Sequence, residues 1–176
     1  MIFWPSLAIA YEKKRGLQAL IENRQSIVAK IADRAGSGHA MLAYGVAVAI
    51  VAAYKRDPKL RAFVRRYAKA GARGFVMFQA SRFVLAERRP KEGGAMRFFR
   101  LHGHGVSGHT FAAALVVGPI METWGPGLSR RDRALLSAML HAWVAFIAWS
   151  RVALGEHYVW NTMLGARLGL RAGRQR

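Results

Sequence analysis

The chain alternates short apolar blocks with strongly basic stretches, and this alternation restricts its fold more than any other feature of the sequence. The apolar blocks cover approximately residues 1–10, 40–54, 74–86, 110–124, 134–149 and 157–170. They are rich in alanine, leucine and valine, and no Asn-Gly hairpin turn lies between them. Since this composition favours helices over strands, we predict an all-α helical bundle that forms a single domain over residues 1–176.

The length of the apolar blocks leaves two environments open for such a bundle. A helix that spans a bilayer needs about 20 apolar residues, with a range of roughly 17–25, and several of the blocks are shorter than this. Either the helices extend past the apolar runs, with lysine and arginine side chains reaching the interface, or the chain is a soluble bundle with a large core. Basic loops between apolar blocks favour an integral membrane protein with five to six short transmembrane helices.

The charge of the chain points to an anionic partner. The net charge is +19, although 53% of the residues are hydrophobic. Such a balance suggests a nucleic acid, an anionic lipid or an anionic substrate. The apolar blocks leave no continuous solvated basic helix, which argues against nucleic acid, so we expect the membrane and an anionic lipid as partners. The absence of cysteine excludes disulfides and cysteine metal sites.

The first 36 residues combine an apolar segment with an amphipathic helix. Residues 1–10 are apolar but lack a positive leader, because Lys13, Lys14 and Arg15 follow them instead. This order indicates a membrane-dipping segment rather than a cleavable signal peptide. Residues 17–33 have apolar side chains at near-helical spacing with charged residues between them, which predicts an amphipathic helix.

Three motifs carry the chemistry, and one of them is the sequence Ser107-Gly108-His109 at the start of an apolar block. Serine is a good N-cap, and the first turn of a helix offers free backbone N–H groups at its positive end. A helix start of this kind binds anions, and glycine lets the backbone approach the anion closely. The motif alone is weak evidence, because the same three residue types recur at positions 37–39.

A second motif follows the fifth apolar block and contains Ser150, Arg151, His157 and Asn161. Residues four apart share one face of a helix, so the side-chain oxygen of Asn161 could accept from the ring Nδ1–H of His157. That hydrogen bond would leave Nε2 of the imidazole free to act as a nucleophile. The guanidinium of Arg151 offers a planar fork of donors for phosphate oxygens.

The remaining motif contains Arg82, Arg89 and Pro90, near the end of the third apolar block. The two arginines are seven residues apart, which places them near one face if both lie on one helix. Pro90 is expected to end that helix. Two arginines on one stripe would suit a group with two negative charges.

Taken together, the three motifs resemble the phosphatidic acid phosphatase type 2 superfamily over residues 75–170. The family pattern is Lys-x6-Arg-Pro, then Pro-Ser-Gly-His, then Ser-Arg-x5-His-x3-Asp. The resemblance implies six membrane helices and a metal-free, cofactor-free hydrolysis of a phosphate monoester or diphosphate. It implies that His157 is the nucleophile, forming a phosphohistidine, and that His109 protonates the leaving oxygen and then activates water. The phosphate-binding residues that it implies are Arg82, Arg89, Ser107, Gly108 and Arg151.

This chain departs from the family pattern at three positions, which are occupied by Arg82, Val106 and Asn161. The change at Asn161 matters most, because an amide can orient an imidazole but cannot stabilise its charged form as the family's aspartate can. Two functions therefore remain open. One is an active lipid phosphatase, and the other is a catalytically weakened relative that binds anionic lipid without turnover. Glu156 is a candidate substitute carboxylate, although its place beside His157 would point it elsewhere.

The distribution of charge predicts how the chain lies in the cell membrane. If six helices alternate across the bilayer, the three motifs fall on one face, and the basic stretches near residues 55–73, 130–133 and 171–176 fall on the other. Short basic loops mark the cytoplasmic side, so the motifs are expected on the extracytoplasmic face. Candidate substrates are phosphatidic acid, phosphatidylglycerophosphate and a polyprenyl diphosphate. A metal site at His102, His104 and His109 is conceivable, but no carboxylate or cysteine lies beside them in the sequence.

Overall fold

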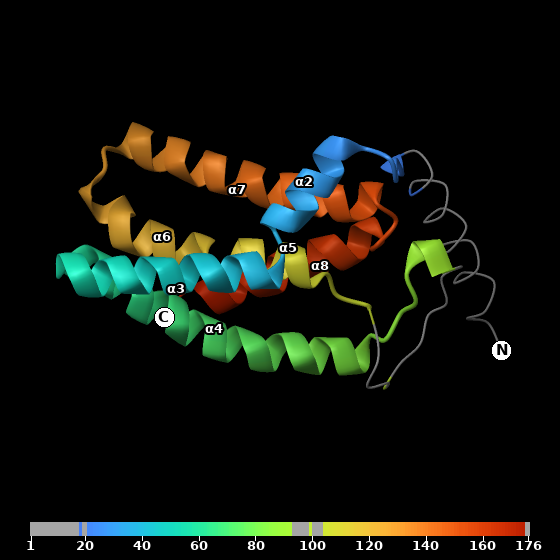
Figure 1. Ribbon diagram of the computed structural model, residues 1–176, viewed down its shortest axis with the longest axis horizontal. Coiled ribbons are helices and arrows are strands. Elements are labelled where there is room, and N and C mark those ends of the chain that lie inside the picture. Colours follow the sequence, from blue (N-terminus) through green and yellow to red (C-terminus); the bar gives the residue numbers. More distant parts are fainter. Residues whose placement is uncertain (1–17, 19–20, 93–98, 100–103, 175–176) are drawn as a thin grey trace.

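The structure is a computed structural model that describes residues 18, 21–92, 99 and 104–174. The predicted membrane-dipping segment at residues 1–10 lies outside this described part. The helices are α2 (Ile27–Ala35), α3 (Gly38–Lys55), α4 (Pro58–Val84), α5 (Gly108–Leu115), α6 (Val117–Trp124), α7 (Arg130–Ala153) and α8 (Val159–Gly173), with short 3₁₀ turns η1 (Pro90–Glu92) and η2 (Gly125–Gly127). No strand occurs among the described residues, which confirms the predicted all-α bundle (Figure 1).

Side-chain caps fix where several of the helices begin. Ser26, Ser37, Ser107 and Ser129 each accept a hydrogen bond from a backbone N–H in the first turn of the helix that follows. Asp57 does the same for α4, and Pro58 occupies its first position, where the missing N–H has no cost. The serine–glycine–histidine sequence at 37–39 is therefore an ordinary helix start, and the side chain of His39 is exposed.

The amphipathic helix predicted over residues 17–33 is interrupted. A turn follows Glu22, and its backbone is held by bonds from Asn23 N–H to the Ala153 carbonyl (2.7 Å) and from Ser26 N–H to the Asn23 carbonyl (3.1 Å). Ser26 then caps a new helix, α2. The capping serine and the bond to α7 compete with a continuous helix at this point.

The apolar face of α2 points away from the bundle. Ala29 and Ala32 are buried, whereas Ile27, Val28 and Ile31 have exposed fractions of 73%, 55% and 62%. The small alanines let α2 pack closely on α7, and the large side chains face the surroundings. A helix with this pattern suits the surface of a bilayer.

The fourth apolar block, predicted over residues 110–124, forms two helices that meet at Val116. Pro119 explains the break, because a proline has no N–H to donate and its ring clashes with the carbonyl four residues earlier. That carbonyl belongs to Leu115, the last residue of α5.

The tightest packing in the bundle joins α8 to α5 through three glycines at four-residue spacing. A Cβ atom on Gly165 would lie 2.7 Å from the Ser107 carbonyl oxygen, and one on Gly169 would lie 2.3 Å from the Phe111 carbonyl oxygen. A Cβ on Gly173 would lie 2.4 Å from the Leu115 carbonyl oxygen. The two backbones therefore touch along the whole of α5, which no larger side chain at these positions would allow.

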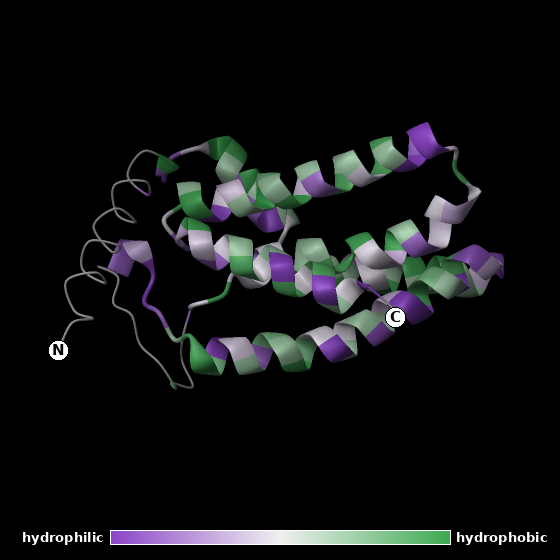
Figure 2. Ribbon diagram, turned by 180° about the vertical axis from the view of Figure 1, so that it is seen from behind, coloured by the Kyte–Doolittle hydropathy of each residue, from purple (hydrophilic) through white to green (hydrophobic). Residues whose placement is uncertain are grey.

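Two of the described helices are long and apolar enough to cross a bilayer, α3 and α7. A core helix of a soluble protein would pass the same test, but such a helix is buried. Only 11% of the apolar window of α3 and 28% of that of α7 are buried inside the bundle. Large exposed side chains such as Leu42, Ile50, Leu135 and Met139 cover their outer faces. Figure 2 shows hydrophobic residues along the long helices and hydrophilic ones where α7 begins.

The two ends of the bundle differ in what they carry. The loops that follow α4, precede α5 and join α7 to α8 lie at one end, together with η1 and α2 (Figure 1). The turn between α3 and α4 and the start of α7 lie at the other end. This arrangement separates the three sequence motifs from the basic turns that contain Arg56 and Arg130.

We predict that Gly169→Ala destabilises the bundle, because its methyl group would collide with the backbone of α5. Overpacking of this kind costs about 1–3 kcal/mol, or several degrees of melting temperature in a chain of this size. Thermal unfolding of the detergent-solubilised protein measures the change. Gly71→Ala is the matched control on α4, since a Cβ there would meet no atom within 4 Å. An unchanged melting temperature in Gly169→Ala would contradict the close packing.

Candidate active site

Backbone hydrogen bonds tie the three motif loops together. Ser107 N–H donates to the Asn161 carbonyl at 3.3 Å, which joins the start of α5 to the first turn of α8. Lys91 N–H donates to the Gly155 carbonyl at 3.2 Å, which joins η1 to the α7–α8 turn. The motifs therefore form one site, although their residues are far apart in the sequence.

The turn between α7 and α8 fixes His157 relative to Arg151. The backbone N–H groups of Glu156 and His157 both donate to the Arg151 carbonyl, at 3.0 Å and 3.1 Å. Gly155 has a φ of +68°, a left-handed conformation that side chains with a Cβ rarely adopt. The side chains of Arg151 and His157 are both buried at this turn.

The start of α5 forms a preorganised group of donors. Ser107 is fully buried, and its Oγ accepts from Thr110 N–H at 3.4 Å and lies 3.1 Å from the Thr110 hydroxyl. The backbone N–H groups of Gly108 and His109, at the first two positions of α5, have no carbonyl partner within the helix, so they are available to an anion. A Cβ on Gly108 would lie 3.0 Å from the Phe78 ring, so glycine permits the packing of α4 here.

Cations from two motifs surround the carboxylate of Glu156. Arg89 Nη1 lies 2.8 Å from Glu156 Oε2, and Arg151 Nη2 lies 3.5 Å from the same oxygen. Lys91 Nζ contacts the other oxygen, Oε1. Glu156 therefore pairs with the cations of the site, and its carboxylate does not serve His157 as a substitute for the family's aspartate.

The ionisation of Glu156 follows from these contacts. Burial opposes the charged carboxylate, but the hydrogen bond from Lys91 and the charges of Arg89 and Arg151 outweigh it and lower the pKa of Glu156. The carboxylate is therefore charged at neutral pH. It occupies the position of an anion among three cations, as a phosphoryl group would.

His157 is held in its neutral form. Burial lowers the pKa of His157 well below its ordinary value, and the charges of Arg151 and Arg89 act in the same direction. Burial and the charge of Arg89 also lower the pKa of the His104 imidazole. The backbone N–H of His104 donates to the Glu87 carbonyl at 3.0 Å. A neutral imidazole can attack an electrophile, which a protonated one cannot.

A carboxylate from α2 also reaches the site. Asp33 Oδ1 contacts Arg151 Nη1 and lies 3.6 Å from Nε2 of His109. Asp33 precedes these partners by a large part of the chain, and the packing of α2 on α7 brings it to them. One oxygen thus lies between the guanidinium of one motif and the imidazole of another.

The sequence model of the PAP2 superfamily matches residues 83–174, which is more than half of the chain. The chain belongs to the PAP2 superfamily. The fold agrees with the crystal structure of a transmembrane PAP2-type phosphatidylglycerolphosphate phosphatase from Bacillus subtilis, at 19% identity and a TM-score of 0.63, covering 98% of this chain and 85% of that one. It also agrees with Aquifex aeolicus LpxE, at 18% identity and a TM-score of 0.57, covering 90% of each chain. A comparison with curated proteins gives no match.

Most of the predicted residues come together in the described structure. Ser107, Gly108 and His109 lie at the start of α5, beside the turn that carries His157, and the guanidinium groups of Arg89 and Arg151 share one carboxylate. Arg82 lies on α4, with its guanidinium 5.6 Å from the centre of the Phe78 ring. Its positive charge contributes to lowering the pKa of His104, in the loop that precedes α5.

The prediction that Arg82 and Arg89 share a helix face is wrong, because α4 ends at Val84. After Leu85 the chain packs against the loop before α5. His104 N–H bonds to the Glu87 carbonyl there, and a Cβ on Gly105 would lie 1.7 Å from the Leu85 carbonyl oxygen. Arg89 therefore reaches the site from a loop, and Pro90 begins η1 rather than ending α4.

The predicted hydrogen bond between Asn161 and His157 is not formed in the described structure. Nδ1 of His157 and Oδ1 of Asn161 are both buried without a hydrogen-bond partner. The prediction placed both residues on one helix, but α8 begins at Val159, so His157 lies in the turn before it. Asn161 contributes its backbone carbonyl to Ser107 instead.

Sequence reasoning missed two charged residues of the site, Asp33 and Lys91. Lys91 directly follows Arg89 and Pro90, so its position beside that motif was a usable signal. Asp33 gave none, because a single acidic residue on an amphipathic helix is ordinary. For the conceivable histidine metal site, His102 lies outside the described residues, and no cluster of three metal-binding side chains occurs within them.

Proposed function

We propose that this chain is a membrane-embedded phosphatase that hydrolyses a lipid phosphate or diphosphate through a phosphohistidine on His157. The observation that carries the proposal is a buried, neutral imidazole next to a buried guanidinium and a helix start, in a chain of the PAP2 superfamily. The two structural neighbours support the choice of substrate class. One is named as a transmembrane phosphatidylglycerolphosphate phosphatase, and the other as LpxE.

The proposed reaction has two steps. A ring nitrogen of His157 attacks phosphorus, the bond from phosphorus to the lipid oxygen breaks, and His109 gives its proton to that oxygen. His109 then accepts a proton from water, whose oxygen attacks phosphorus and breaks the nitrogen–phosphorus bond to release inorganic phosphate. Neither step in this proposal uses a metal or a cofactor.

The charged residues of the site would hold the phosphoryl oxygens. Arg89 and Arg151 already converge on one carboxylate, and the free amides at Gly108 and His109 point from the start of α5. Arg82 would add its charge from the end of α4. A phosphate would share these donors with Glu156 or displace it from them, because both anions use the same guanidinium forks.

The outer surface of the bundle supports a lipid substrate and a multi-pass position in the cell membrane. Exposed apolar side chains cover α3 and α7, and those of α2 face outward beside the motif end. Since the basic turns lie at the opposite end, the positive-inside rule supports an extracytoplasmic position for the motif end. Phosphatidic acid, phosphatidylglycerophosphate and polyprenyl diphosphate each combine an apolar tail with the required anionic group.

We expect His157→Ala to abolish phosphate release from these lipids, presented in mixed micelles and assayed for inorganic phosphate. Removing the nucleophile eliminates the covalent step, so the loss should exceed about a thousandfold. His39→Ala is the control, because His39 is the exposed histidine of the second Ser-Gly-His sequence. Turnover that persists in His157→Ala would refute the assignment.

A second candidate function is lipid binding without turnover, and the buried, unpartnered Oδ1 of Asn161 is the observation that favours it. Asn161→Asp separates the two functions in the same assay. We expect measurable turnover in the wild type and faster turnover in the variant, since a carboxylate stabilises the charged imidazole. An inert wild type with an active Asn161→Asp variant would establish the binding function instead.

Asp33 acts in this proposal as a positioning residue for His109. Its carboxylate oxygen lies 3.6 Å from Nε2 of His109 and contacts the guanidinium of Arg151. It therefore orients the imidazole and offsets part of the positive charge of Arg151, and in this proposal the bound phosphate supplies the rest of the stabilisation that a protonated His109 needs. Asp33 thus gives the site a carboxylate, although the family's aspartate is replaced by Asn161. The carboxylate of Asp33 lies beside His109 and not beside His157.

We predict that Asp33→Asn slows hydrolysis, and that the size of the loss depends on how strongly the leaving oxygen needs a proton. An alkyl lipid phosphate needs protonation of its leaving oxygen, so turnover should fall by about tenfold or more, whereas p-nitrophenyl phosphate should change by less than about threefold. The exposed neighbour Arg34 provides the control variant Arg34→Gln on the same helix. Equal losses on both substrates would show that Asp33 is merely structural.

A further inference from the structure

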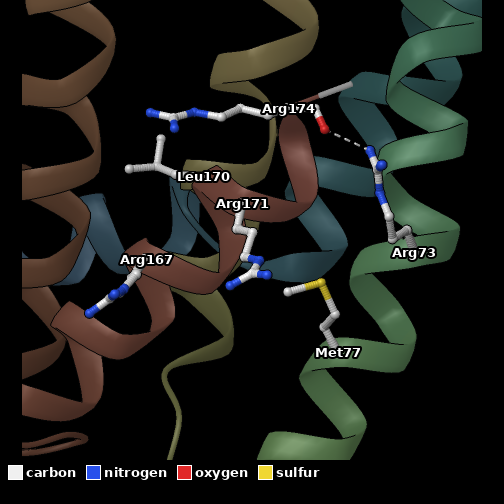
Figure 3. A pocket seen from close by; sticks show the side chains of 6 residues that line it. All are labelled: Arg73, Met77, Arg167, Leu170, Arg171 and Arg174. Carbon is white, nitrogen blue, oxygen red and sulfur yellow. Dashed lines mark hydrogen bonds between the residues drawn. The ribbon is translucent and has the colours of Figure 1, made fainter. Parts of the chain in front are cut away.

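A basic pocket lies between α4 and the C-terminal half of α8 (Figure 3). Its volume is about 530 Å³. The residues that line it are Arg73, Met77, Arg167, Leu170, Arg171 and Arg174. Four of the six are arginines, so the pocket concentrates positive charge beside the apolar side chains of Met77 and Leu170.

No ion pair among the described residues neutralises this charge. Arg73 donates hydrogen bonds to the carbonyl oxygens of Ala172 (2.8 Å) and Arg174 (3.0 Å), which fastens the end of α8 to α4. No carboxylate among the described residues forms an ion pair with any of the four pocket arginines. Gathering like charges in one pocket is unfavourable, and a bound anion relieves that repulsion. Guanidinium forks match phosphate oxygens in geometry as well as in charge.

The pocket is separate from the catalytic site. Arg171 follows Asn161 by ten residues on α8, which at 1.5 Å per residue corresponds to about 15 Å along the helix axis. Figure 1 shows α8 running from the motif loops toward the opposite end of the bundle. An anion held by Arg171 therefore lies beyond the reach of His157.

The surroundings of the pocket favour an amphiphilic anion. Val76 follows Arg73 by three residues on α4, and Met163 precedes Arg167 by four residues on α8, so each shares a face with a pocket arginine. Both side chains are 67% exposed. They add exposed apolar surface to α4 and to α8 on the side of the pocket nearer the motif end. The acyl chains of a lipid could lie along this surface.

We propose that this pocket binds the phosphate headgroup of an anionic phospholipid in the leaflet opposite the catalytic end. The lipid is a ligand of the protein and not its substrate, because its phosphate is remote from His157. Basic pockets between helices on the cytoplasmic side of a membrane protein are suited to anionic headgroups. The bound headgroup would join α8 to α4 and so stabilise the helix on which Asn161 lies.

Thermal unfolding in nanodiscs tests this binding without using enzyme activity. The wild type is compared in phosphatidylcholine alone and in phosphatidylcholine that contains phosphatidylglycerol. We expect phosphatidylglycerol to raise the melting temperature by roughly 5 °C at saturation. The double variant Arg167→Gln/Arg171→Gln should lose most of this shift. The matched control Arg130→Gln/Arg131→Gln, which removes the same charge at the exposed start of α7, should keep it.

Three results would overturn the proposal. An equal melting temperature of the wild type in both nanodiscs would overturn it. This result needs no variant, so it holds even if the double variant fails to fold. A full phosphatidylglycerol shift in Arg167→Gln/Arg171→Gln would show that the pocket is not involved. An arginine-dependent shift of the same size from inorganic phosphate, in phosphatidylcholine alone, would show that the ligand is a soluble anion. None of these results bears on catalysis by His157.

Discussion

The close contact between α5 and the glycine face of α8 is the interaction on which the rest of the site depends. Because Gly165 has no side chain, the carbonyl of Ser107 can approach α8, and Ser107 N–H can reach the carbonyl of Asn161. The donor end of α5 is thereby fixed beside the start of α8, which directly follows the turn that carries His157. The backbone position of His157 is itself set by a hydrogen bond to the Arg151 carbonyl. Gly165, which has no proposed role in the reaction, thus determines how closely the start of α5 approaches α8 and the turn that carries His157.

Charge is the second constraint, since the site must keep one imidazole neutral among several cations. Burial and the nearby guanidinium groups both disfavour a charged His157. Glu156 and Asp33 balance those guanidinium groups from two directions, and each also links distant elements of the bundle. In the proposed reaction, a phosphate ester would meet donors that are already oriented, so little reorganisation would be needed when charge develops in the transition state.

The sequence predicted what depends on local pattern, and it failed where tertiary contacts decide. The apolar blocks and serine caps gave the helices, and the resemblance to a known family assembled Arg89, His109, Arg151 and His157 into one site. The end of α4 at Val84 was missed because the loop before α5 packs against the chain there and stops the helix. The contacts of Asp33 with His109 and Arg151 were missed because only the packing of α2 on α7 brings the residue there.

The central claim, that His157 is the nucleophile and His109 its proton carrier, is tested most directly by trapping the phosphoenzyme. Wild-type protein is mixed with a lipid carrying labelled phosphate, quenched in alkali, where phosphohistidine persists, and digested for mass spectrometry. The peptide that contains His157 should carry the phosphate, and its label should disappear when unlabelled substrate is added before the quench. Label on the peptide that contains His109 would contradict the assignment of the two histidines.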